Sequence, residues 1–280
     1  APKEPCSGER LQKLVVDGRA LCAYLPVAYA SEPERRFPVV FAFPGFSGNA
    51  VHNDGFGARA LFDRFPATPV IVIGVETRIP EGTGYLSGAW DAFVVDRVLP
   101  EVDRQLRTDG RRLAFGHSTG GWNALAVGLR HPDRFVAVAA SSPDPLDLDV
   151  WLRGADGKVE PRWFHWQRAE QPLGGRGQFT SWALSWSGGR PLFADDGTLR
   201  AEVLAAWKAQ SPMALLGARI PVFVTAGRSD MFKLYAPSLR FVEVAREKNA
   251  DVTWAPTDLD HFGHTEARFA GLVAFLISKL

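Results

Sequence analysis

A serine between glycines is the first feature of this sequence that could do chemistry. The run is Gly116-His-Ser-Thr-Gly120, with Ser118 at its centre. The apolar residues before it predict a buried strand at 112–116, and apolar residues at helical spacing after it predict a helix at 119–130. A Gly-x-Ser-x-Gly between a strand and a helix is typical of a tight turn that exposes the hydroxyl. Ser118 is therefore the expected nucleophile, with the N-terminus of the helix offering N–H groups to a developing anion.

A serine hydroxyl needs a base, normally a histidine that a carboxylate orients. On an elbow of this kind the acid follows the serine along the chain, and the histidine follows the acid. Asp230 follows the strand predicted at 221–227 after a short turn. It is favoured over Asp258 and Asp260, which lie in the histidine loop itself, and over Asp195 and Asp196, which lie in the segment 143–217.

Two histidines, His261 and His264, lie between the last predicted strand and the last predicted helix. His261 is favoured as the base because it comes earlier in the loop. His264 follows a glycine and could already belong to the start of the helix, so it stays the alternative. The other four histidines precede Asp230, and the expected chain order disfavours them.

The negative charge of a tetrahedral intermediate requires preorganised N–H donors. One expected donor is the backbone N–H of Thr119, directly after the nucleophile. The other is expected from the loop after the strand at 37–43, where Phe46 follows Gly45.

A metal site is the competing interpretation of the histidine loop. His261 and His264 with Asp258 or Asp260 could be imagined as ligands, but their spacing is not His-Glu-x-x-His and no cysteine cluster supports them. We expect neither a metal nor a cofactor.

Apolar runs and turn signals predict alternating strands and helices. Two strands are predicted within 11–27 and further strands at 37–43, 70–75, 112–116, 135–141, 221–227 and 251–255; helices are predicted at 88–107, 119–130, 236–249 and 265–279. Pro100 is expected to kink or interrupt the helix at 88–107. This alternation is typical of an α/β protein with a mostly parallel, doubly wound sheet and its site at the carboxyl ends of the strands.

Residues 143–217 interrupt the alternation. They predict no clear strand and hold six of the nine tryptophans: Trp151, Trp163, Trp166, Trp182, Trp186 and Trp207. We expect one domain over 1–280, with this segment as a cap-like insertion over the strand ends. Most of its aromatic rings are expected to pack on one another, while Trp151 and Trp182, with Trp122 of the elbow helix, are candidates for the substrate pocket.

Charge and cysteine content limit the partners and the compartment. With 32 basic and 31 acidic residues the net charge is +1, which does not favour nucleic acid as a partner. No apolar run is long enough to span a bilayer. Cys6 and Cys22 are expected to form a disulfide, with two free thiols as the alternative. The expected disulfide, together with an N-terminus that resembles a processed one, favours a secreted or periplasmic protein over a cytoplasmic one. The oligomeric state is not predicted.

Four stretches carry a resemblance to known proteins: Leu21-Cys-Ala-Tyr-Leu-Pro26, Gly116-His-Ser-Thr-Gly-Gly-Trp122, Ser141-Ser-Pro-Asp-Pro-Leu-Asp147 and Gly177-Gln-Phe-Thr-Ser-Trp182. In these stretches the sequence resembles the esterase D type of esterases, a family that includes S-formylglutathione hydrolases, feruloyl esterases, enterochelin esterases and mycolyltransferases. The resemblance implies an α/β-hydrolase fold with Ser118 as nucleophile, Asp230 as acid and one of the two loop histidines as base.

The expected function is a serine hydrolase that cleaves small-molecule carboxylic esters through an acyl-enzyme. An acyltransferase of the same fold, which passes the acyl group to an alcohol, is the first alternative. A serine peptidase and a non-catalytic binding protein are the others; the Ser, Asp and His set argues against the last.

Overall fold

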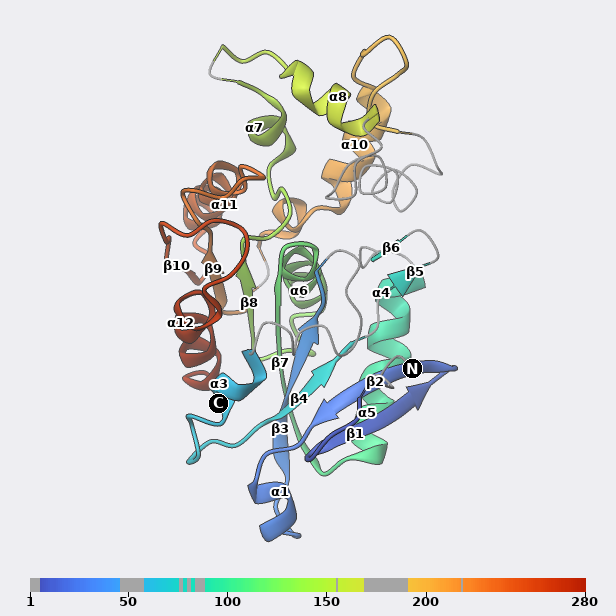
Figure 1. Ribbon diagram of the computed structural model, residues 1–280, viewed down its shortest axis with the longest axis vertical. Coiled ribbons are helices and arrows are strands. Elements are labelled where there is room, and N and C mark those ends of the chain that lie inside the picture. The colour runs from blue at the N-terminus through green and yellow to red at the C-terminus, as the bar shows by residue number, and fades with distance from the viewer. Residues whose placement is uncertain are drawn as a thin grey trace.

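The computed structural model describes residues 6–45, 58–75, 78–79, 82–83, 89–154, 156–168, 191–217 and 219–280. A mixed sheet with the strand order β1-β2-β4-β3-β7-β8-β9-β10 runs through these residues (Figure 1). Its strands are β1 (Leu11–Val16), β2 (Arg19–Tyr24), β3 (Phe37–Phe43), β4 (Ile71–Gly74), β7 (Thr108–His117), β8 (Ala137–Ser141), β9 (Val222–Thr225) and β10 (Val252–Trp254). β1 is antiparallel to β2, and β2 is antiparallel to β4. The six strands β4, β3, β7, β8, β9 and β10 are parallel to one another, which confirms the doubly wound α/β prediction.

The N-terminal hairpin is closed by a two-residue turn and tied down by a disulfide. Asp17 and Gly18 have φ values of 48° and 77°, the left-handed conformation that a tight hairpin turn of this kind requires. Cys6 and Cys22 form the expected disulfide, which links the arm before β1 to β2. A separate short ribbon consists of β5 (Arg78–Ile79) and β6 (Gly82–Thr83).

Helices cover both faces of the sheet, so its central strands are buried on both sides. β3 shows this best: Phe41 and Phe43 pack in one core, whereas Val40 and Ala42 pack in the other. The first core includes residues of η1 (Phe93–Val98), α5 (Leu99–Gln105), α6 (Thr119–Arg130) and α11 (Tyr235–Glu247), and the second includes residues of α3 (Ala58–Phe62) and α12 (Thr265–Ile277). Burial on both faces explains why these strands are continuous apolar runs in the sequence.

The helix predicted at 88–107 consists of three consecutive pieces. α4 (Ala89–Ala92) leads into the π-helix η1, which leads into α5. Pro100 lies in the first turn of α5, where a missing N–H is tolerated. The N–H of Leu99 donates to the carbonyl of Val94, five residues back, so the expected interruption takes the form of wide π turns before the proline.

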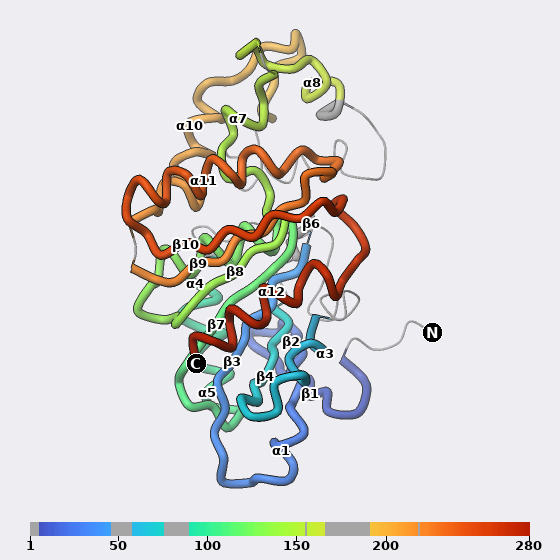
Figure 2. The backbone as a smooth tube through the Cα atoms, turned by 90° about the vertical axis from the view of Figure 1, so that its left-hand side faces the viewer, coloured from blue at the N-terminus to red at the C-terminus, as the bar shows by residue number. Residues whose placement is uncertain are grey.

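The described parts of residues 143–217 lie beyond the carboxyl ends of the parallel strands (Figures 1 and 2). They contain α7 (Leu148–Leu152), α8 (Pro161–Arg168), α10 (Ala201–Gln210) and η2 (Pro212–Leu215). Trp151, Trp163 and Trp207 are buried in the same core cluster as β3 and α6. The short helix α1 (Ala28–Ser31) lies at the opposite end of the molecule.

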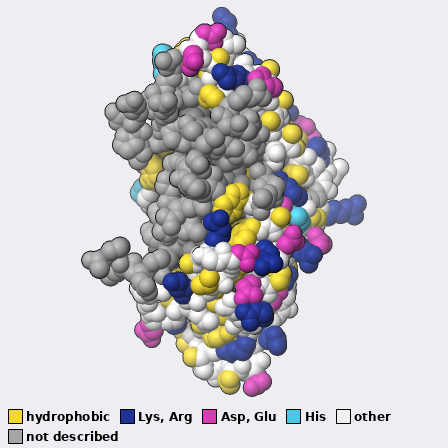
Figure 3. Space-filling view, turned by 90° about the vertical axis from the view of Figure 1, so that its right-hand side faces the viewer, with side chains coloured by type: hydrophobic (Ala, Val, Ile, Leu, Met, Phe, Trp, Pro, Cys, Tyr) yellow, Lys and Arg dark blue, Asp and Glu magenta, His cyan; other side chains and the backbone are white. Residues whose placement is uncertain are grey.

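Basic and acidic side chains are interleaved on the lower half of the face shown in Figure 3. Ion pairs of the described residues include Arg97 with Asp17 and Arg104 with Glu101. Over the described ranges, the helices are all too short or too polar to cross a membrane.

Candidate active site

Ser118 lies at a strained turn between β7 and α6. Its φ of 58° and ψ of −128° place a non-glycine residue in a costly backbone conformation, which persists only where the surroundings enforce it. Two glycines allow the close packing around it. A Cβ on Gly116 would lie 2.2 Å from the backbone of Gly120, and a Cβ on Gly120 would lie 2.0 Å from the carbonyl of Phe43. The local fold therefore has the geometry expected of a nucleophile elbow.

His261 and Asp230 form a buried pair after the ends of β10 and β9. Nδ1 of His261 lies 2.8 Å from Oδ2 of Asp230. The other carboxylate oxygen of Asp230 accepts the backbone N–H of Phe232 at 2.9 Å. The Asp230 carboxylate is thus held at both oxygens and orients the imidazole, as a base–acid pair requires.

The rival residues are placed elsewhere. His264 is exposed and takes a left-handed conformation at the start of α12. Asp258 is exposed and pairs with Arg228 at 2.9 Å. Asp230 is therefore joined to His261 and not to His264.

His117 connects the elbow to the histidine loop. Its Nε2 lies 3.0 Å from the carbonyl of His261, its Nδ1 lies 3.1 Å from Oγ of Ser141, and its ring centroid is 4.6 Å from that of His261. A carbonyl only accepts, so Nε2 carries the hydrogen and Nδ1 accepts from the Ser141 hydroxyl. Burial, followed by the charges of His261 and Arg268, holds the pKa of His117 well below its usual range. The neutral imidazole of His117, the residue before Ser118, is thus hydrogen-bonded to the backbone of His261, the candidate base.

This histidine should make the protein sensitive to acid. As pH falls below about 6.5, unfolded chains take up a proton on residue 117 that the folded chain does not. The free energy of unfolding therefore decreases as the pH falls, and this one group contributes up to about 1.4 kcal/mol per pH unit to the decrease. We expect urea unfolding between about pH 7 and pH 5 to show a shallower pH dependence for His117→Gln than for the wild type.

The exposed His165 provides a matched control, because it lies outside the buried site. His165→Gln should keep the wild-type dependence of stability on pH. An unchanged pH dependence in His117→Gln would show that residue 117 does not carry the effect.

Aromatic rings surround the His261 imidazole. Phe232 and Phe262 contact it edge-on, with centroids 4.6 Å and 4.9 Å from its own. The carbonyl of Phe232 accepts Nε1–H of Trp151 at 2.8 Å. Through this bond α7 of the inserted segment supports the turn that carries Asp230.

Arg268 of α12 holds the backbone of the histidine loop through hydrogen bonds to its carbonyls. Its guanidinium is buried and donates to the carbonyls of Asp260 at 2.5 Å and Gly263 at 3.3 Å. Burial lowers the pKa of Arg268. These bonds fix the loop on both sides of His261.

The candidate oxyanion donors are only partly within the described residues. Thr119 is the first residue of α6. The first N–H groups of a helix have no carbonyl acceptor within the helix, so the N–H of Thr119 can donate to another group. Phe46 lies outside the described residues. The residue before it, Gly45, is close to Ser118: a Cβ there would lie 3.8 Å from Cβ of Ser118.

The tryptophans proposed for the pocket are placed in the core where the structure describes them. Trp122 is 0% exposed and Trp151 is 2% exposed, the latter with its ring centroid 4.0 Å from that of Trp163. Neither presents a side chain to solvent here. Trp182 lies outside the described residues.

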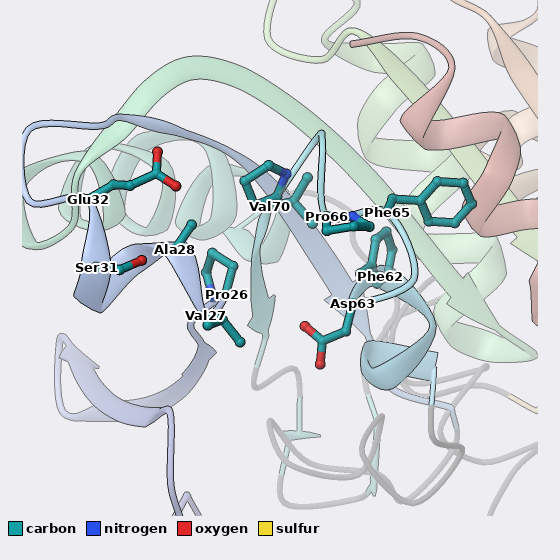
Figure 4. Close-up of a pocket in the computed structure, with 11 residues that line it drawn as sticks. Pro26, Val27, Ala28, Ser31, Glu32, Phe62, Asp63, Phe65, Pro66 and Val70 are labelled. Carbon is teal, nitrogen blue, oxygen red and sulfur yellow. The ribbon is translucent and has the colours of Figure 1, made fainter.

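A cavity of about 250 Å³ lies away from the elbow, beside α1 and α3 (Figure 4). It lies beside the amino-terminal end of β4 and includes none of the candidate catalytic residues. Its lining includes Pro26, Val27, Ala28, Glu32, Phe62, Asp63, Phe65, Pro66 and Val70. Among the residues that the structure describes, no three His, Cys, Asp or Glu side chains form a possible metal site.

Sequence reasoning missed two residues of the site, His117 and Asp144. Asp144 is 2% exposed and lies 3.2 Å from Oγ of Ser118. It follows the carboxyl end of β8 just as Asp230 follows that of β9, so the rule that found Asp230 could have found it.

Comparisons with known proteins agree with this fold. A ferulic acid esterase structure superposes with a TM-score of 0.67 at 19% identity, covering 96% of this chain and 97% of that one. An S-formylglutathione hydrolase of Agrobacterium tumefaciens gives a TM-score of 0.61 at 18% identity, with 96% and 94% covered. FphF, a fluorophosphonate-binding serine hydrolase of Staphylococcus aureus, gives 0.62 at 14% identity, with 96% and 98% covered.

These structures share the α/β-hydrolase fold with this chain. No curated protein sequence matches the chain. The model of the family described as "Putative esterase" matches residues 18–253. Because this match spans most of the chain, the protein belongs to that esterase family and is a carboxylic ester hydrolase.

Proposed function

We propose that the protein hydrolyses small-molecule carboxylic esters through an acyl-enzyme on Ser118. His261 takes the hydroxyl proton as Oγ attacks the carbonyl carbon, and Asp230 stabilises the imidazolium that forms. The proton passes to the leaving alcohol, and a water activated by His261 then releases the acid. The N–H groups of Thr119 and Phe46 are the proposed donors to the oxyanion.

The observation that carries the proposal is the convergence of three chain segments. The elbow holds Ser118 at a φ of 58°, and the next residue back, His117, bonds to the backbone of His261 at 3.0 Å. His261 in turn bonds to Asp230 at 2.8 Å. A strained serine beside a buried, oriented imidazole is the arrangement that nucleophilic catalysis needs.

Trapping the intermediate tests the proposal. With p-nitrophenyl acetate we expect a burst of p-nitrophenol and an acetyl group on the peptide that contains Ser118, found by mass spectrometry. Acetylation at another residue, or turnover without any adduct, would contradict an acyl-enzyme on Ser118.

Adding methanol to the same reaction identifies the acceptor. If water deacylates the enzyme, acetate stays the main product. Predominant methyl acetate at low methanol concentration would indicate an acyltransferase instead.

The domain organisation and the compartment are further parts of the proposal. Trp151, Trp163 and Trp207 share one core with the sheet, which supports a single domain with an insertion at 143–217. The disulfide between Cys6 and Cys22 supports an oxidising, secreted or periplasmic environment.

A further inference from the structure

Asp144 is a buried residue that forms three hydrogen bonds with the elbow. Its Oδ1 accepts the hydroxyl of Ser118 at 3.2 Å, and its Oδ2 accepts the hydroxyl of Thr119 at 2.6 Å. Its backbone N–H donates to the carbonyl of Ser118 at 3.2 Å. The carboxylate is therefore built into the nucleophile turn, although the proposed triad already has its acid in Asp230.

A second strained residue directs Asp144 towards the elbow. Ser142, directly after β8, has a φ of 38°, and its N–H donates to the carbonyl of Thr225 at 2.7 Å. This bond continues the pairing of β8 with β9, and the chain bends at Ser142 and again at Asp144. Strain of this kind is retained where the surroundings enforce it, commonly at functional sites.

The hydroxyl of Ser118 has one proton, and Asp144 accepts it. Among the described residues, no hydrogen bond joins Oγ of Ser118 to the ring of His261. The same proton cannot be donated to both groups, so the observed arrangement is not yet the one that attacks.

We propose that Asp144 is a positioning residue that holds Ser118 in a resting orientation, from which the hydroxyl must turn to His261 before each acylation. The inference rests on the proposed function of Ser118 as nucleophile. The hydrogen bond from Oγ of Ser118 to Oδ1 of Asp144 slows acylation, because it must break before the hydroxyl can donate its proton to His261.

Asp144→Asn tests this with little change in volume. An asparagine has one acceptor oxygen where the carboxylate has two. If that oxygen accepts the hydroxyl of Thr119, the amide N–H₂ faces Ser118 and leaves the hydroxyl proton free for His261. If it accepts the hydroxyl of Ser118 instead, that hydrogen bond is between neutral groups and is weaker than one to a carboxylate.

The measurement is the second-order rate constant for inactivation of Ser118 by phenylmethanesulfonyl fluoride, with the burst rate on p-nitrophenyl acetate beside it. We expect both to rise about five- to tenfold in Asp144→Asn, with KM unchanged. A purely structural role would lower the melting temperature and the rates together.

Asp149→Asn is the matched control. Asp149 lies in the same segment but pairs with Arg153 at 3.9 Å and with Lys208, away from the elbow. It should leave both rates unchanged, and a rise there equal to that in Asp144→Asn would overturn the inference.

An unchanged or lower inactivation rate in folded Asp144→Asn also overturns it. If Asp144→Asn does not fold, a ligand-free crystal structure of the wild type decides: Oγ of Ser118 on Asp144 supports the resting state, and Oγ on Nε2 of His261 refutes it. A Ser118→Ala protein that still reacts with the sulfonyl fluoride and still turns over ester would instead refute the proposed function.

Discussion

Ser118→Ala should reduce kcat for p-nitrophenyl acetate by roughly 10⁵-fold or more, because no other group can form the acyl bond at the elbow. The substitution removes the side-chain oxygen that Asp144 binds at 3.2 Å and leaves the backbone of the turn in place. The melting temperature should therefore stay close to that of the wild type. Initial rates over a range of ester concentrations and a thermal unfolding curve are the measurements.

Ser278→Ala is the matched control for this loss. The hydroxyl of Ser278 bonds only locally, to the carbonyl of Phe275 at 2.7 Å, at the end of α12. This variant should keep wild-type kcat. Substantial turnover by folded Ser118→Ala, above the rate in buffer, would mean that the nucleophile lies elsewhere.

His261→Gln should lower kcat by about 10⁴-fold or more, whereas His264→Gln should change it less than about threefold. A glutamine amide can still donate to Asp230, so the buried carboxylate keeps a partner while the base is lost. His264 is exposed and has no contact with Asp230 among the hydrogen bonds of the described residues.

Kinetics of the two variants on p-nitrophenyl acetate, with their unfolding curves, form a matched pair. The comparison would reverse the assignment if His264→Gln carried the large loss. Equal, small losses in both folded variants would mean that neither ring is the base.

Much of the scaffold could be predicted from residue patterns. A strand buried on both faces must be apolar at every position, which is why Phe37–Phe43 was recognisable as β3. The helix over 119–130 was predicted at the bounds that α6 has, because its apolar spacing and its flanking turn are both local signals. Asp230 was favoured on a different ground, because the acid is expected after the serine along the chain and just beyond the carboxyl end of a strand.

The choice between the two loop histidines needed the packing of the loop. Both rings lie within a few residues of each other in the sequence, and their separation in space is set by Arg268, which holds the carbonyls of Asp260 and Gly263. Contacts between segments far apart in the chain leave no periodic trace in it. The placements of Phe46 and Trp182 remain predictions.

The sequence by itself determined the order of strands and helices, the elbow with Ser118 and the region where acid and base had to lie, because these depend on local propensity and burial. Only the tertiary structure decided that His261 meets Asp230, that His117 joins the elbow to the histidine loop, and that the carboxylate of Asp144 receives the serine hydroxyl. Those three relations depend on distances between loops, which are set by how both faces of the sheet are packed.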